Sequence, residues 1–198
     1  MTEAKQKLDS KIATMVEGAE HPRLVARRLF LYDFVEAFAT NQDRGFQILN
    51  TICEHFKLPF SAVKVVGSAQ TGYSYYKERD FVSGQSDLDV AIISATLFQE
   101  YSHEIYSLTE RYTDLTRFHR KKGISVAQYF RDNLASGLFR PDLMPECKLK
   151  ADWFSFFNKL SNNYVDLFSN INAGIYLSEA FFECKHLTII DAYRKGRP

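Results

Sequence analysis

The stretch from Val63 to Ser94 constrains this chain more than any other, because it places a long polar loop between two strand-like runs. The first run is rich in valine and ends at Gly67-Ser68. The second run opens with Asp87 and Asp89 and continues into apolar residues. Short β-branched runs bounded by glycine and polar residues are typical of strands. The order predicts a strand, a tight glycine turn, a loop, and a second strand that begins with two acids.

The spacing of the two acids indicates a cation site. Successive side chains on a strand point to opposite faces, so Asp87 and Asp89 are expected to share one face. Two neighbouring carboxylates repel each other, and one of them tends to take up a proton. A divalent cation removes that conflict, and Mg²⁺ is commonly bound by one or two carboxylates together with substrate phosphates and water. We therefore expect Mg²⁺ or Mn²⁺ at Asp87 and Asp89.

The glycine turn supplies the second half of a nucleotide site. Glycine lets the backbone turn tightly and approach a ligand closely. If a helix follows the turn, its N–H groups favour phosphate. Gly67 and Ser68 are thus candidate phosphate-binding residues.

Val66-Gly67-Ser68 followed by Ser86-Asp87-Leu88-Asp89-Val90 resembles the glycine-serine and paired-aspartate signature of the DNA polymerase β-like nucleotidyltransferase superfamily. The resemblance implies a small mixed sheet, a turn that grips a triphosphate, and a strand that holds metal. It implies transfer of a nucleoside monophosphate from a nucleoside triphosphate to an acceptor hydroxyl of a nucleic acid, a protein or a small molecule. It assigns nucleotide binding to Gly67, Ser68 and Ser86, and catalysis and metal binding to Asp87 and Asp89.

The loop between the two runs carries the positive charges that lie nearest to the aspartates in sequence, Lys77 and Arg79. Cations offset phosphate charge in phosphoryl transfer, so both are candidate nucleotide-binding residues. The alternative is that both are ordinary loop charges. The three tyrosines of this loop could stack on a base or pack the loop itself. Long loops inside compact domains tend to be functional or mobile.

The third carboxylate of the superfamily, on a later strand, has no clear counterpart. Nucleotidyl transfer needs a base or metal ligand near the attacking hydroxyl. Asp152, Asp166 and Asp191 have apolar neighbours and are candidates, although the first two lie in predicted helix. A second hypothesis therefore stays open, a catalytically degenerate binding module of this fold, such as an antitoxin-like or defence-associated partner protein.

Charge and composition limit the possible partners. The chain has 198 residues and a net charge of +1, so no global charge draws it to nucleic acid. Its one dense basic run is the best candidate for contact with a nucleic-acid or protein acceptor, and the alternative is a solvated loop. A module that only binds nucleic acid through this run is a third hypothesis. The run contains Arg117, Arg120, Lys121 and Lys122.

The chain has three cysteines, which are widely spaced. The absence of a CxxC pair argues against a zinc site, and the odd number argues against a closed disulfide framework. A reducing, cytoplasmic setting fits them best. No apolar run approaches about 18 residues, and the N-terminus is polar. We therefore expect no membrane partner and no signal peptide.

Hydrophobic periodicity predicts an α+β, mostly helical fold with a small mixed sheet built on residues 62–66 and 87–93. We expect a single domain over 1–198, with a helical part (1–57), a nucleotidyltransferase-like core (58–116) and a mainly helical part (117–198). A packed loop is expected at 137–145 and a possible strand at 175–177. Helices are expected over 3–17, 22–39, 42–57, 95–116, 124–134, 151–171 and 178–195.

Overall fold

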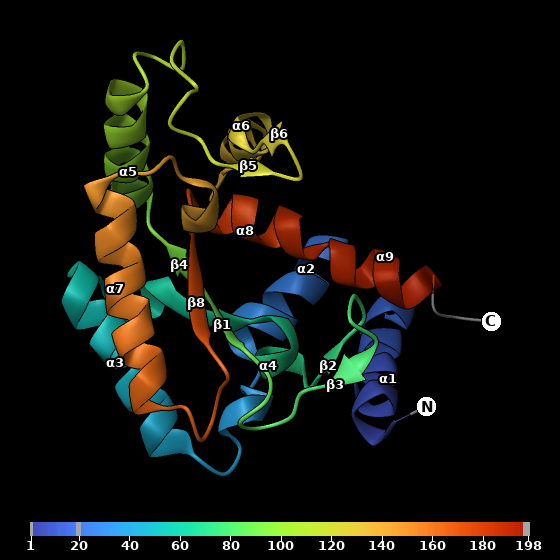
Figure 1. Cartoon of the computed structure of the whole chain (residues 1–198). Coiled ribbons are helices and arrows are strands. Elements are labelled where there is room, and N and C mark those ends of the chain that lie inside the picture. The colour runs from blue at the N-terminus through green and yellow to red at the C-terminus, as the bar shows by residue number, and fades with distance from the viewer. Residues whose placement is uncertain (1, 19–20, 196–198) are drawn as a thin grey trace.

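The computed structural model describes residues 2–18 and 21–195 and has an α+β fold around a four-stranded mixed sheet (Figure 1). The strand order is β1 (Val63–Val66), β4 (Leu88–Ile93), β8 (Ile171–Tyr176) and β7 (Leu138–Phe139). β4 runs antiparallel to β1 and parallel to β8, and β7 pairs antiparallel with β8. The predicted fold class is confirmed, and the two predicted strands lie side by side. The C-terminal half supplies the other two strands.

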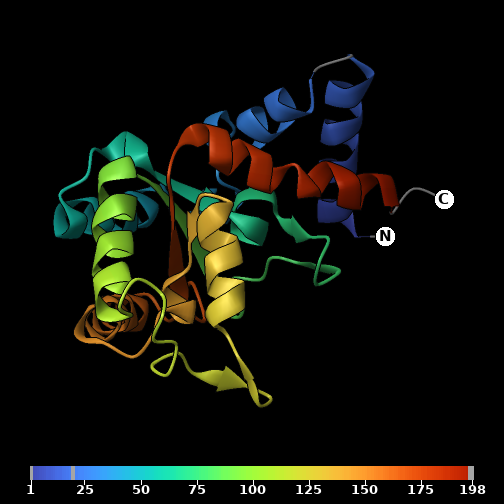
Figure 2. The ribbon, with the colours of Figure 1, turned by 90° about the horizontal axis from the view of Figure 1, so that it is seen from above.

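Alternation along β4 sends side chains into two different layers. Leu88, Val90 and Ile92 enter a large aromatic core, whereas Ala91 enters a smaller cluster on the opposite face. Figure 2 shows helices on both sides of the sheet. The first layer contains α3 (Gln42–Phe56), α5 (Ala95–Leu108) and α7 (Lys148–Asn163), and the second contains α1 (Glu3–Glu17), α2 (Pro22–Arg27), α8 (Glu179–His186) and α9 (Thr188–Lys195).

The N-terminal helices follow the apolar pattern only in part. The predicted helix over 3–17 is confirmed as α1, and the helix over 42–57 as α3. The predicted helix over 22–39 is wrong in its second half. After α2 the chain forms a π-helical turn, η1 (Arg28–Tyr32), becomes extended at Asp33, and re-forms a 3-10 turn, η2 (Glu36–Phe38).

A tertiary interaction accounts for this break. The buried amide of Gln70 donates to the backbone carbonyls of Leu29 (2.8 Å), Asp33 (3.1 Å) and Phe34 (3.3 Å). Carbonyls that would otherwise accept bonds from the next helical turn are satisfied by this side chain instead. The break thus depends on a residue 36 or more positions later.

The middle of the chain departs from the prediction at the end of α5. The helix stops at Leu108 rather than near residue 116, because Glu110, Arg111 and Tyr112 all have left-handed backbone conformations. The Arg111 N–H instead reaches back to the carbonyl of Tyr106 (2.8 Å). The chain then forms a small hairpin and a short helix, so the predicted helix over 124–134 begins late. These elements are β5 (Arg120–Lys121), β6 (Ile124–Ser125) and α6 (Ala127–Ala135).

The C-terminal part holds the largest correction. The predicted helix over 151–171 ends at Asn163, and Ile171 already belongs to β8. The predicted packed loop over 137–145 is buried as expected but also contributes β7 and the 3-10 turn η4 (Pro141–Leu143). The predicted helix over 178–195 is present as α8 followed by α9.

No helix within the described ranges 2–18 and 21–195 combines the length and apolar character needed to cross a bilayer. The thiols of Cys53, Cys147 and Cys184 are free, in agreement with the prediction that no disulfide framework forms.

Candidate functional site

The glycine turn and the aspartate strand meet directly. Val66, at the end of β1, pairs with Asp89 on β4, and Gly67 begins the short helix α4 (Gly67–Thr71). Gly67 has a φ of +67°, and a Cβ added there would lie 3.0 Å from Oδ2 of Asp89. Only glycine permits both that conformation and that approach without strain. The two halves of the sequence signature therefore form one site.

Backbone bonds to a distant segment position Asp87 just ahead of β4. The Leu88 N–H donates to the carbonyl of Asn170 (2.8 Å), and the Ser169 N–H donates to the carbonyl of Ser86 (3.1 Å). The Ser169 hydroxyl also donates to Oδ1 of Asp87 (2.8 Å). This fixes one carboxylate oxygen of Asp87 and leaves the other toward Lys77, whose Nζ lies 3.5 Å from Oδ2.

The Asp89 side chain is exposed on β4 and lies among closely packed neighbours. The surrounding protein raises its pKa above the usual value, the nearby Asp87 carboxylate raises it further, and Lys77 and Arg140 act in the opposite direction. The surrounding protein and the Asp87 carboxylate thus both disfavour the charged form of Asp89, and a bound cation would favour it. Two carboxylates with substrate phosphates are a sufficient donor set for Mg²⁺.

Across residues 2–18 and 21–195, no three His, Cys, Asp or Glu side chains come together as a metal-holding group. A cation at Asp87 and Asp89 would consequently need oxygens from substrate, water or a neutral side chain.

The two loop cations have different surroundings. Lys77 contacts Asp87, whereas the exposed Arg79 lies on β3 (Arg79–Asp80), which pairs with β2 (Tyr73–Ser74). Among the described residues, Lys77 is therefore the loop cation that reaches the aspartates.

The loop that carries Lys77 is anchored to α1. The Thr2 hydroxyl donates to Oδ1 of Asp80 (2.6 Å), and the Tyr75 hydroxyl donates to Asp9. Tyr73 is buried in the same cluster as α1, and Tyr76 is 95% exposed. Two of the three loop tyrosines thus pack the loop, and Tyr76 is the one open to a ligand.

The two predicted serines differ. Ser68 is half-buried and lines a cavity of about 480 Å³, which we call the turn pocket, between the start of α4, loop residues 73–76 and α9. Ser86 is buried, and its hydroxyl accepts a bond from the Val82 N–H (3.0 Å). Ser68 therefore lies beside Gly67 in the turn pocket, whose lining includes neither aspartate, while Ser86 fixes the backbone of the segment that leads to Asp87.

Sequence reasoning missed a residue on β8. Asn172 pairs in register with Asp89 on the neighbouring parallel strand. Its Oδ1 accepts a bond from Nδ2 of Asn170 (2.9 Å), whose own Oδ1 accepts from the Ser161 hydroxyl (2.9 Å). An amide is thus held beside Asp89 on a later strand, where the resemblance implies a third carboxylate. A search restricted to acids could not find it.

The three acids proposed for the third position lie elsewhere. Asp166 is exposed and forms a bidentate ion pair with Arg44, with two hydrogen bonds. Asp152 pairs with Lys148 on α7 (2.5 Å), and Asp191 is exposed on α9. None of them lines a cavity with Asp89.

A second cavity, which we call the edge pocket, opens beside Asp89 and is lined mainly by β8, α7 and the segment after β7, with Val66 of β1 and Val90 of β4. Its volume is about 450 Å³. Aromatic side chains of α7 line it together with Arg140, which follows β7. Its lining includes Asp89, Asn172, Arg140, Asp142, Trp153, Phe154, Phe157, Asn158 and Tyr176.

The basic run lies on the β5–β6 hairpin and the loop before it. Arg117, Arg120, Lys121 and Lys122 are exposed, and none of them forms an ion pair with another described residue. By contrast, Arg23 and Arg27 both pair with the buried Glu183.

No protein-family model, curated protein or solved structure matches this chain. The functional assignment accordingly depends on the geometry of the site.

Proposed function

We propose that this protein is a Mg²⁺-dependent nucleotidyltransferase of the polymerase β-like type. It would move a nucleoside monophosphate from a nucleoside triphosphate to an acceptor hydroxyl and release pyrophosphate. The observation that carries the proposal is the contact between Gly67 and Asp89, where a Cβ would lie 3.0 Å from the carboxylate oxygen. A phosphate-binding turn and a metal-binding strand must touch in this way if one triphosphate is to engage both.

Each residue then has a role that fits its surroundings. Gly67 and Ser68 border the turn pocket and would hold the outer phosphates. Asp87 and Asp89 would hold the cation, and Ser169 orients Asp87 by its hydrogen bond. Mg²⁺, when bound, supplies charge neutralisation at the phosphates. Lys77 lies close enough to Asp87 to approach the same phosphates and offset their charge.

The acceptor surface is part of the same proposal. We assign contact with a nucleic-acid or protein acceptor to the basic residues of the β5–β6 hairpin and the loop before it, because cations without an ion-pair partner among the described residues remain available to a polyanion. We place the reaction in the cytoplasm, since three free thiols suit a reducing compartment.

One observation favours a second function. Asn172 stands where a third carboxylate would be expected, and an amide can neither accept a proton from the acceptor hydroxyl nor add negative charge for a second cation. The same fold could then bind a nucleoside triphosphate with Mg²⁺ without turnover, as a degenerate module that acts through a partner protein.

The test is incubation of the purified protein with each labelled triphosphate and Mg²⁺, scoring pyrophosphate release and label transfer to RNA, protein and small acceptors. The comparison protein carries Asp87→Asn and Asp89→Asn, and Asp166→Asn serves as a matched control on an exposed carboxylate. We expect turnover by the native and Asp166→Asn proteins only. Equal triphosphate binding by the native and double-variant proteins, without turnover in either, would overturn the proposal.

The Asn172→Asp variant distinguishes the active transferase from the degenerate binding module. Metal-dependent binding without turnover in the native protein, with turnover appearing in Asn172→Asp, would establish the degenerate module. Turnover in the native protein would exclude it.

A further inference from the structure

The order of the strands indicates where an acceptor would enter. β1, which ends just before Gly67, and β8, which carries Asn172, flank β4 on opposite sides. In phosphoryl transfer the attacking and leaving oxygens lie roughly in line on opposite sides of the phosphorus. If the leaving phosphates lie toward Gly67 and Ser68, the attacking hydroxyl comes from the β8 side. The edge pocket draws most of its lining from β8 and the segments beyond it, and it reaches Val66 of β1 at its other end.

The lining of the edge pocket includes the guanidinium of Arg140, which has N–H donors without a partner among the described residues. Arg140 is half-buried, and its Nε and Nη2 donate to the two carboxylate oxygens of Asp142 (3.0 and 2.6 Å). Its Nη1 donates to the Tyr129 hydroxyl (3.2 Å), and the guanidinium lies over the Tyr129 ring, 5.6 Å from its centre. A guanidinium has five N–H donors. Two N–H groups of Arg140 are therefore left without a partner among the described residues.

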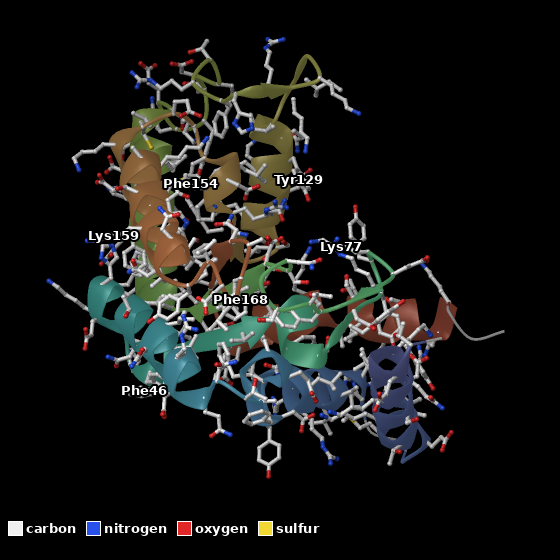
Figure 3. All side chains as sticks on the ribbon, turned by 60° about the horizontal axis from the view of Figure 1, so that its bottom comes forward. Phe46, Lys77, Tyr129, Phe154, Lys159 and Phe168 are labelled. Carbon is white, nitrogen blue, oxygen red and sulfur yellow. The ribbon has the colours of Figure 1, made fainter. Side chains whose placement is uncertain are left out.

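The fixed orientation of Arg140 matters for recognition. Asp142 and Tyr129 hold the guanidinium in one place, so a ligand would meet a preset donor pair rather than a mobile side chain. Arginine recognises carboxylate and phosphate through such paired N–H groups. Phe154 and Trp153 add aromatic surface from α7, and Asn158 adds an exposed amide at the rim. Figure 3 shows Phe154 on α7, Tyr129 on α6 and Lys77 on the turn between β2 and β3.

We infer that the edge pocket is the acceptor site, and that the reacting part of the acceptor carries a planar ring and an anionic group, phosphate or carboxylate. The ring packs against Phe154 and Trp153, and the anion binds Arg140. This inference rests on the proposed function for the direction of attack. In the reaction, the acceptor oxygen bonds to the α-phosphorus, the bond to pyrophosphate breaks, pyrophosphate leaves with its electron pair, and the hydroxyl proton passes to water.

The pocket volume agrees with this size of ligand. About 450 Å³ lies within the range of small-molecule sites, roughly 300–1,000 Å³. A double-stranded nucleic acid could not enter, whereas one ring-bearing unit could.

The test measures binding by calorimetry to the full chain carrying Asp87→Asn, without Mg²⁺ or triphosphate. Asp87 does not line the edge pocket, so this variant disables the proposed cation site and leaves the pocket intact. The probes are two matched pairs, pyridoxine 5′-phosphate against pyridoxine, and N-acetyltyrosine against N-acetyltyrosine amide. We expect the anionic member of at least one pair to bind about ten-fold more tightly, and which pair does so distinguishes phosphate from carboxylate.

Two variants locate the binding. Arg140→Gln should abolish the preference for the anionic probe. Because Arg140 also bonds Asp142 and Tyr129, Asn158→Asp provides a second test on an exposed residue that should fold normally. It should weaken the anionic probe about five-fold through repulsion and leave the neutral probe unchanged. Asn162→Asp, on the same helix but outside the pocket, should change neither.

The outcomes separate this inference from the proposed function. Transfer activity in the native protein without any anionic preference, or a preference that survives both Arg140→Gln and Asn158→Asp, overturns the assignment of the edge pocket alone. Anionic preference that depends on Arg140, in a protein without transfer activity, retains the ligand class and overturns its role as acceptor.

Discussion

The side chains that alternate along β4 have very different surroundings. On one face Leu88, Val90 and Ile92 are at most 3% exposed and lie in the aromatic core. Asp89, whose side chain points away from these three, lies close to Gly67 and is also part of the lining of the edge pocket. Burial of the three apolar side chains removes apolar surface from water, which stabilises the fold. Asp89 is instead a carboxylate whose charged form is disfavoured by its surroundings. The difference teaches that stability and the candidate chemistry can be altered separately on a single strand.

The largest expected effect is on the apolar face. Ile92→Ala removes a fully buried side chain and leaves a cavity, so the free energy of unfolding should fall by roughly 2–5 kcal/mol. Chemical denaturation measures the change. Ile124→Ala, at a position that is 74% exposed, is the matched control and should change stability by less than about 0.5 kcal/mol. Similar losses in both variants would show that the core does not depend on this face of β4.

The next largest effect is expected at Gly67, where the turn after β1 approaches Asp89. Gly67→Ala places a side chain in a left-handed conformation, which costs about 1–2 kcal/mol, and against Oδ2 of Asp89. Gly123→Ala is a matched control, because Gly123 has a φ of +80° but nothing within 4 Å of an added Cβ.

Both glycine variants should lose stability in denaturation because of the left-handed backbone, and Gly67→Ala should lose more because its Cβ also approaches Asp89. Only Gly67→Ala should also lose Mg²⁺-dependent triphosphate binding, measured by calorimetry. Unchanged binding in Gly67→Ala would refute the role of the turn.

The smallest effect concerns the carboxylate itself. The pKa of Asp89 is raised in the folded protein, so the native state holds this proton more tightly than the unfolded chain, whose pKa is near 3.8. The resulting stabilisation is complete below pH 3.8 and is lost as pH rises through the folded pKa. Asp89→Asn should not show this loss, so it should gain stability relative to the native protein as pH rises.

Denaturation across a pH series, with and without Mg²⁺, checks this expectation. Mg²⁺ should restore part of the stability that the native protein loses at higher pH and should have no effect on Asp89→Asn. Identical pH profiles for the two proteins would mean that folding does not raise the pKa of Asp89.

Local pattern predicted much of the fold and half of the site. α1, α3, β1 and β4 appear where periodicity and β-branched runs placed them, and Gly67, Ser68, Asp87 and Asp89 belong to one short stretch whose order is informative by itself. β8 was predicted only at its end, because its sequence, INAGIY, contains asparagine, alanine and glycine, which are poor strand formers. Its pairing with β4 supplies what the local pattern lacks.

The sequence by itself determined that two carboxylates lie two positions apart at the start of a strand and that a glycine turn precedes them, because strand-forming runs and glycine conformation are local properties. Only the tertiary structure decided which residues complete the site. Asn172 reaches Asp89 through a parallel pairing that spans more than 80 positions, and Arg140 joins the same pocket from the segment between these strands. Such pairings depend on which edge of β4 is left free and on how the aromatic core packs, and no single segment carries that information.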